Sequence, residues 1–195
     1  MKKLNFRYLI LSALIISAQL VANADVPFRL DGAASKMVIS GTSSVHDWEI
    51  EVSEFECDAV VKTDENETFS ISDVNVVCEV ENVKSHNKIM DNKTYKALDG
   101  KDHPKITFKS TEQVTISENG KASIKGKLNI AGISKEVVLP FTVAGENDSS
   151  VKLNGKIPVK MSDYGIEPPT AMMGALKTGD EVVISYDIVL QKPAK

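Results

Sequence analysis

One short segment of the chain, His46-Asp47-Trp48, brings together an imidazole, a carboxylate and an aromatic ring. A histidine beside an aspartate could act as an acid/base pair, since histidine is the side chain that most often transfers protons in enzymes. The simpler interpretation is that the two polar groups bond to the backbone where a strand begins, while Trp48 joins the core. We favour the simpler interpretation and expect no catalytic residues.

Other kinds of chemistry lack a sequence signal. The remaining histidines, His86 and His103, are scattered, and neither an H-E-x-x-H motif nor clustered Cys/His spacing is present. A G-x-S-x-G elbow, a Walker A loop and a G-x-G-x-x-G fingerprint are also missing. With 23 basic against 27 acidic residues, a nucleic-acid partner is disfavoured. We therefore expect a protein that is not an enzyme, with no metal and no cofactor.

The two cysteines, Cys57 and Cys78, fall on neighbouring predicted strands with the same inward parity. An exported protein resides where disulfides form, so a bridge is one interpretation. Two buried free thiols, which behave as small apolar groups, are the other. The spacing is not C-x-x-C, so a redox enzyme is not indicated.

The N-terminus has the pattern of a cleavable secretory signal peptide over residues 1–24. A basic stretch precedes the apolar run Tyr8–Val21, and Ala22-Asn23-Ala24 supplies an A-x-A cleavage site. The run is shorter than the roughly 20 apolar residues of a membrane anchor, which disfavours an uncleaved anchor. We expect export to a periplasm, a single domain over residues 25–195, and no stable membrane insertion after cleavage.

Apolar and polar residues alternate with period two along the remaining chain, which predicts a mainly antiparallel all-β protein. In Ala122–Ile130, for example, the even-numbered residues are small or apolar and the odd-numbered ones are polar. Asn119-Gly120 is a strong hairpin signal. About eight such runs predict an eight-stranded barrel. The runs are 28–31, 36–40, 45–61, 69–80, 106–116, 122–130, 151–161 and 182–190.

The alternation changes phase inside two of these runs. The inward parity shifts between Val52 and Phe55, and again between Ile71 and Val74. An inserted bulge residue produces such a shift, so we predict two bulges that bend the sheet. Glu112 is a polar exception on the otherwise inward face of its run.

Residues Val83–Leu98 break the β pattern, because their apolar residues fall at helical spacing. Ser85 is the predicted N-cap and Gly100 the predicted stop. We expect one helix that covers an end or flank of the barrel.

The function depends on whether the barrel is hollow or packed. Ser110, Gly126 and Gly155 have inward parity but supply almost no volume, which favours a hollow interior. The alternative is that the glycines relieve strain at barrel corners. The outward faces carry repeated Lys and Asn, so an outer-membrane barrel is excluded.

Four segments, in this order and spacing, resemble the YceI-like family of lipid- or polyisoprenoid-binding proteins. They are 41–48 (GTSSVHDW), 103–110 (HPKITFKS), 126–135 (GKLNIAGISK) and 161–166 (MSDYGI), followed by a closing strand over 179–191. The resemblance implies a lipocalin-like periplasmic barrel whose interior accepts a long isoprenoid chain, such as a quinone or a prenyl diphosphate.

The leading hypothesis is a carrier that sequesters an amphipathic lipid, with the tail inside the barrel and the head near the loops. A ligand-free stress-response or partner-interaction barrel is the second hypothesis, and an enzyme using His46 and Asp47 is the last. The candidate ligand-binding residues are Ile39, Trp48, Ile50, Phe55, Met90, Phe108, Ser110, Gly126, Leu128, Gly155, Met172, Met173 and Tyr186.

The segment Pro168–Lys177, which contains Met172 and Met173, is rich in small and soft apolar residues and poor in charge. It is either a lid over the mouth of the barrel or an apolar plug in its end, since apolar loop residues usually pack.

Overall fold

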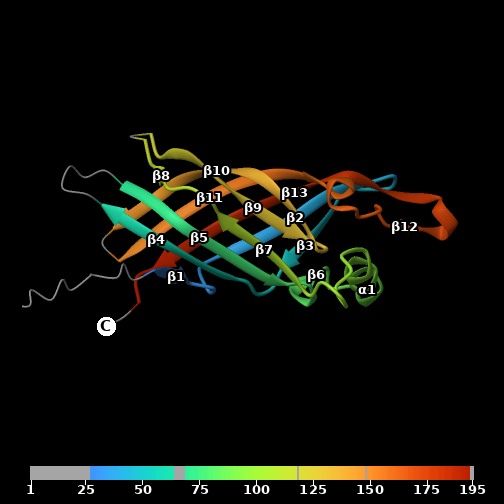
Figure 1. The fold of residues 1–195 in the computed structure, drawn as a ribbon. Coiled ribbons are helices and arrows are strands. Elements are labelled where there is room, and N and C mark those ends of the chain that lie inside the picture. The colour runs from blue at the N-terminus through green and yellow to red at the C-terminus, as the bar shows by residue number, and fades with distance from the viewer. Residues whose placement is uncertain (1–26, 64–68, 118, 148, 194–195) are drawn as a thin grey trace, which may run out of the picture.

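The computed structural model describes residues 27–63, 69–117, 119–147 and 149–193, so the predicted signal peptide lies outside it. These residues form a long twisted barrel with a single helix, α1, near one end (Figure 1). The strands are β1 (Phe28–Leu30), β2 (Lys36–Ser43), β3 (Trp48–Val52), β4 (Glu56–Thr63), β5 (Phe69–Glu79), β6 (Val83–Lys84), β7 (Lys105–Ser110), β8 (Val114–Thr115), β9 (Lys121–Ile130), β10 (Ile133–Asn147), β11 (Ser150–Lys160), β12 (Thr170–Ala171) and β13 (Leu176–Gln191). The helices are α1 (Lys88–Ala97) and the 3₁₀ turns η1 (Val80–Asn82), η2 (Met161–Tyr164) and η3 (Met172–Gly174).

The barrel closes because β13 pairs with β11 along one edge and with β1 and β2 along the other. Its C-terminal end pairs with β1, where Gln191 faces Arg29. Its earlier residues pair with β2, where Ile184 faces Ile39. The ring of β1, β4, β5, β7, β9, β10, β11 and β13 is antiparallel at every step, while β2, β3 and β6 extend the wall. This ring confirms the predicted all-β, eight-stranded barrel. Closure leaves no open sheet edge in the ring, because the backbone N–H and C=O groups of the first and last strands pair with each other.

The two predicted bulges have different outcomes. In β5 the bulge is present: Asp58 pairs with Asn75 and Val60 with Ser72, so β5 contains one extra residue. Asp73 has a φ of 51°, which places the bulge at that residue. The bulge predicted between Val52 and Phe55 is wrong, because the chain leaves the sheet over residues 53–55 and resumes as β4. A break between two strands shifts the inward parity of the residues in the same way as a bulge within one strand, so the sequence pattern does not separate the two.

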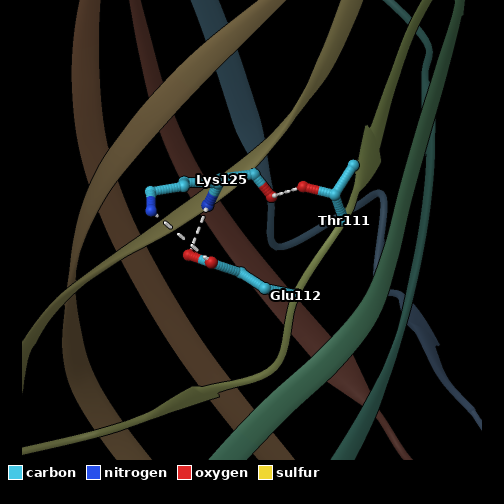
Figure 2. A network of polar contacts seen from close by, with 3 residues as sticks. All are labelled: Thr111, Glu112 and Lys125. Carbon is cyan, nitrogen blue, oxygen red and sulfur yellow. Dashed lines mark hydrogen bonds and ion pairs between the residues drawn. The ribbon is translucent and has the colours of Figure 1, made fainter.

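Glu112 does not interrupt a strand. It is exposed and lies in the bend between β7 and β8. Its carboxylate accepts a hydrogen bond from the backbone N–H of Lys125 at 3.3 Å and lies 3.8 Å from the Lys125 Nζ. The Thr111 hydroxyl donates to the Lys125 carbonyl oxygen at 3.4 Å (Figure 2), and the Thr111 backbone N–H donates to the same oxygen at 2.9 Å. The polar exception in the sequence therefore marks the point where the chain turns beside β9.

The helix is shorter than predicted and has a different N-cap. Val83 belongs to β6, and the cap is Asn87, whose side chain accepts hydrogen bonds from the N–H groups of Ile89 and Met90. Ser85 instead donates its hydroxyl to the Asp91 carboxylate at 2.6 Å. That hydrogen bond, with a second from the Ser85 backbone, lowers the pKa of Asp91.

The C-terminus of the helix is close to the predicted stop. Asp99, with a φ of 51°, takes the left-handed position, and the Gly100 N–H donates to the Tyr95 carbonyl oxygen. This is a Schellman arrangement, which satisfies carbonyl groups at the helix end.

Candidate functional site

A cavity of about 330 Å³ lies at the end of the barrel where α1 and β12 are located (Figure 1). This outer cavity is within the range of about 300–1,000 Å³ that is usual for small-molecule sites. Its wall comes from β2, β3, β6, α1, η2, β12 and the first half of β13, together with the ends of β5, β7, β9 and β11. The apolar lining residues are Met37, Ile39, Trp48, Ile50, Val52, Cys78, Val83, Met90, Ala97, Leu98, Ile106, Ile130, Val159, Met161, Tyr164, Ile166, Pro169, Leu176, Val182 and Ile184.

A second cavity, the inner chamber, lies further into the barrel and has a volume of about 120 Å³. Among the described residues, Thr107 is the only one in its lining that is neither apolar nor aromatic. Four residues line both cavities, and we call them the collar: Met37, Cys78, Ile106 and Ile184. The barrel interior is therefore a divided apolar space with a constriction between its two parts.

The charged side chains that line the outer cavity are lysines. Two lysines, Lys93 on α1 and Lys177 on β13, line it together with His46. Among the residues that the structure describes, no Asp or Glu lines this cavity. Lys93 donates from Nζ to the Thr170 carbonyl oxygen at 3.2 Å, which links α1 to β12. An apolar space bordered by cationic groups matches an amphipathic molecule with an anionic head.

His46 and Asp47 do not form the acid/base pair that one hypothesis required. The His46 ring nitrogen Nδ1 lies 2.7 Å from the backbone carbonyl oxygen of Asp47 rather than from its carboxylate. The backbone of His46 is held by Ser43, whose hydroxyl donates to the His46 carbonyl oxygen. The neighbouring Trp48 donates its indole N–H to the Thr42 carbonyl oxygen at 3.0 Å. Backbone bonding and a packed Trp ring are the arrangement that we favoured from the sequence.

The structure divides the predicted ligand-binding residues into three groups. Ile39, Trp48, Ile50 and Met90 line the outer cavity. Phe108, Leu128 and Tyr186 line the inner chamber. Phe55 packs between the core clusters without lining either space. Also outside the two linings are Ser110, Gly126, Gly155 and Met173, and the side chain of Met172 lies outside the described part of the chain.

The inward glycines do not leave empty space, which corrects the hollow interpretation at these positions. A Cβ on Gly126 would overlap the Phe108 ring and lie 2.6 Å from the Lys109 carbonyl oxygen. A Cβ on Gly155 would overlap the Pro140 carbonyl oxygen and lie 2.6 Å from the Tyr186 hydroxyl oxygen. Each glycine therefore lies beneath an aromatic ring of an adjacent strand, and the ring supplies the missing volume.

We expect Gly155→Ala to destabilise the barrel by about 1–3 kcal/mol, because the added methyl group forces Tyr186 and β10 to move. The Tyr186 hydroxyl donates to the Pro140 carbonyl oxygen at 2.6 Å, so the displacement also strains this bond. Gly145→Ala is the matched control on β10, since nothing lies within 4 Å of a Cβ at that position. Urea unfolding of the two variants measures the difference, and equal stability would contradict the packed-wall interpretation.

Ser110, whose small side chain predicted a hollow interior, has a structural role instead. Its hydroxyl oxygen accepts a hydrogen bond at 2.9 Å from the N–H of Val74, which directly follows the bulge residue Asp73. A bulge disrupts the ladder and leaves backbone groups in need of partners. Ser110 supplies one of them.

The cysteines are both buried and free. Cys57 pairs with Val76 across the β4–β5 ladder, so Cys78 is two residues further along. Such diagonal neighbours have Cα atoms about 7–8 Å apart, which exceeds the span of an ordinary disulfide. Burial raises the pKa of Cys57 to about 12 and that of Cys78 to about 11, with smaller contributions from Asp58 and Glu79.

We expect neither thiol to react with iodoacetamide in the folded protein at about pH 8, because the thiolate is the nucleophile. Both should react after unfolding. Because the folded state holds these protons more tightly than the unfolded state, their contribution to stability should decline as the pH rises above 9, the unperturbed thiol value, towards about 12.

Mass spectrometry after alkylation tests the labelling, and thermal melts between pH 8 and 10 test the pH dependence. The double variant Cys57→Ala/Cys78→Ala should have a flatter stability curve above pH 9. Rapid labelling of the native protein, or a mass two hydrogens lower, would contradict the buried free thiols.

The segment Pro168–Lys177 contains both buried-facing and exposed positions. Pro169, Thr170, Leu176 and Lys177 line the outer cavity. Met173, in contrast, is fully exposed and has a φ of 54°. Met173 therefore does not plug the barrel end, while the lid interpretation stays a prediction.

The two lysines and all four collar residues line the cavities but were not predicted as site residues. Met37 and Ile184 share the parity of Ile39 and Tyr186, so alternation could have found them. For Lys93 the available signal was its helical spacing with Met90, Thr94 and Ala97, all of which line the cavity. No sequence pattern around Lys177 marks it as a cavity residue, because its position depends on the hydrogen bonds between β13 and Ser44 in the β2–β3 turn.

Two features are absent from the described residues. No cluster of three or more His, Cys, Asp or Glu side chains could hold a metal ion there. No helix in the same ranges has the length and apolar character needed to cross a membrane.

A closed antiparallel barrel with an apolar interior, open beside a helix at one end, defines the class of ligand-binding β-barrels. The family model of the YceI-like domain matches residues 28–190. The chain therefore belongs to the YceI-like family, and the predicted family resemblance is confirmed. No curated protein sequence matches this chain.

Solved structures agree on the fold. Burkholderia cenocepacia BcnA is 24% identical with a TM-score of 0.66, over 82% of this chain and 98% of that protein. A polyisoprenoid-binding domain from Saccharophagus degradans, implicated in plant cell wall breakdown, is 11% identical with a TM-score of 0.69, over 86% and 99%. The Campylobacter jejuni YceI protein is 20% identical with a TM-score of 0.57, over 72% and 82%.

Proposed function

We propose that this protein binds an amphipathic lipid with a long apolar chain, such as an isoprenoid, without performing catalysis. The observation that carries the proposal is the divided apolar interior of the barrel, whose outer cavity is bordered by cationic side chains. Each CH₂ group transferred from water into such a space contributes about 0.8 kcal/mol, so chain length supplies most of the affinity. The polyisoprenoid-binding domain of similar fold supports an isoprenoid as the ligand.

We propose that the head of the lipid lies at the mouth of the outer cavity, beside its cationic side chains. Lys93 and Lys177 would meet an anionic group such as a phosphate or diphosphate, while the tail extends past Trp48 and Ile50 towards the collar. A neutral quinone head would leave this charge unused. We therefore favour a prenyl phosphate over a quinone.

The proposed location is the periplasm, with residues 25–195 as the mature domain after cleavage of residues 1–24. The basic, apolar and A-x-A pattern of the N-terminus supports this location. A long-chain lipid is insoluble in such an aqueous compartment, so a soluble carrier for it has a clear physical purpose.

Organic extraction and mass spectrometry of freshly purified protein test for a stoichiometric lipid. In solution, a long prenyl phosphate and the prenyl alcohol of equal chain length should both bind. The double variant Lys93→Gln/Lys177→Gln should weaken phosphate binding about 10- to 100-fold, since hydrogen bonds to charged groups contribute about 1.5–3 kcal/mol. Its affinity for the alcohol should be unchanged.

Lys96→Gln is the matched control, because Lys96 is on the same helix but exposed and outside the cavity lining. Absence of binding by either molecule would refute the proposed function. Equal losses for phosphate and alcohol would refute the anionic head.

A further inference from the structure

Three apolar side chains stand in solvent around the mouth of the outer cavity. Val45 is 61% exposed, Ile89 73% and Met173 fully exposed. They are the most exposed large hydrophobic side chains among the described residues. The two less exposed ones, Ile133 and Val138, are on β10. Contiguous exposed apolar groups on a soluble protein usually mark a surface that contacts something else.

The three residues come from separate parts of the chain, but hydrogen bonds join their segments at one end of the barrel. The N–H of Ser44, next to Val45, donates to the Lys177 carbonyl oxygen at 2.9 Å. The Lys177 N–H donates back to the Ser44 hydroxyl at 3.1 Å. Lys93, four residues after Ile89, bonds to Thr170 on the strand that leads to Met173. Val45, Ile89 and Met173 thus lie on segments that border the cavity, and we call these three residues the apolar rim.

Lysines outnumber acids on helix α1, which carries Ile89 of the apolar rim, although the whole chain is acidic. Helix α1 carries three lysines, Lys88, Lys93 and Lys96, all exposed, against one acid. That acid, Asp91, accepts two hydrogen bonds from Ser85 and is only partly exposed. The other segments carry Lys177 together with two acids, Asp47 at the β2–β3 turn and Glu167 before β12, so the excess of positive charge lies on α1.

We propose that the apolar rim docks the barrel on the surface of an anionic phospholipid bilayer, with the outer cavity turned towards the membrane. The inference rests on the proposed function for its purpose, since a lipid entering or leaving the cavity must cross from a membrane. Apolar side chains enter the boundary between headgroups and acyl chains, and lysines are attracted to anionic headgroups. Three side chains and one helix give a weak, reversible contact, as a carrier that must leave the membrane requires.

Sedimentation with vesicles tests the docking directly. Wild-type protein should bind vesicles of phosphatidylglycerol and phosphatidylethanolamine, and bind vesicles of phosphatidylcholine alone more weakly. The triple variant Val45→Ser/Ile89→Ser/Met173→Ser should bind the anionic vesicles at least tenfold more weakly. Val138→Ser, which removes an exposed apolar side chain from β10, should bind like the wild type. Lys88→Glu/Lys96→Glu should lose binding to the anionic vesicles.

The outcomes separate the rim from the cavity. Binding of a solubilised prenyl phosphate, measured without vesicles, should be the same in the triple variant and the wild type, while transfer of that lipid from vesicles should be slower. The docking proposal is overturned if the wild-type protein does not sediment with anionic vesicles, or if the triple variant binds them as strongly as the wild type. If solubilised lipid does not bind, the proposed function fails, and the vesicle measurement still decides whether the rim docks.

Discussion

Thr94→Trp should reduce the affinity for a long-chain prenyl phosphate about 100-fold while the barrel stays folded. Thr94 is half-buried on the side of α1 that faces the outer cavity. An indole ring there would occupy much of a 330 Å³ space and exclude part of the lipid tail. Exclusion of about four CH₂ groups costs about 3 kcal/mol, which corresponds to a factor of about 100.

Lys96→Trp is the control for Thr94→Trp, because it places the same ring on the exposed side of the same helix. Fluorescence titration gives the affinities, and circular dichroism and thermal melts report folding. Unchanged affinity in a well-folded Thr94→Trp variant would place the lipid somewhere other than the outer cavity.

Cys78→Leu should shorten the longest chain that the protein can hold. Cys78 is in the collar, so a larger side chain there closes the passage from the outer cavity to the inner chamber. Affinity should then stop rising with chain length at the point where the tail reaches the collar. Short prenyl phosphates should bind as tightly as they do to the wild type, whereas long ones should lose about tenfold for each two CH₂ groups excluded.

Met37→Ala is the opposite change, because it widens the collar and should favour long chains. Met161→Ala is the matched control: Met161 lines only the outer cavity, so its effect should be similar at every chain length. Affinities across a series of prenyl phosphates with one head group make the comparison, and melts exclude unfolding of Cys78→Leu by overpacking. Parallel losses for short and long chains in Cys78→Leu would show that the inner chamber does not hold the tail.

The glycine positions illustrate the limit of reasoning from alternation. Period two identifies Gly126 and Gly155 as inward, because successive side chains of a strand point to opposite faces. It says nothing about which residue lies across from them. Tyr186 pairs with Gly155, and the Phe108 ring covers Gly126, only because the register of two ladders aligns them. Two small inward residues that predicted empty space therefore lie in a packed wall.

The sequence by itself determined the features that depend on neighbours along the chain. The positions of most strands, the inward and outward faces, the bulge near Asp73 and the place of the helix all follow from local periodicity and turn residues. The closed barrel was also predictable, since the number of alternating runs limits the architectures available to them.

Only the tertiary structure decided the site. Lys93 and Lys177 are 84 positions apart, and they line one cavity because α1 bonds to β12 while β13 bonds to the β2–β3 turn. The collar likewise joins residues of β2, β5, β7 and β13. Such contacts depend on strand register and barrel closure, which are set by pairing between distant segments, and a local pattern of residues carries no information about that pairing.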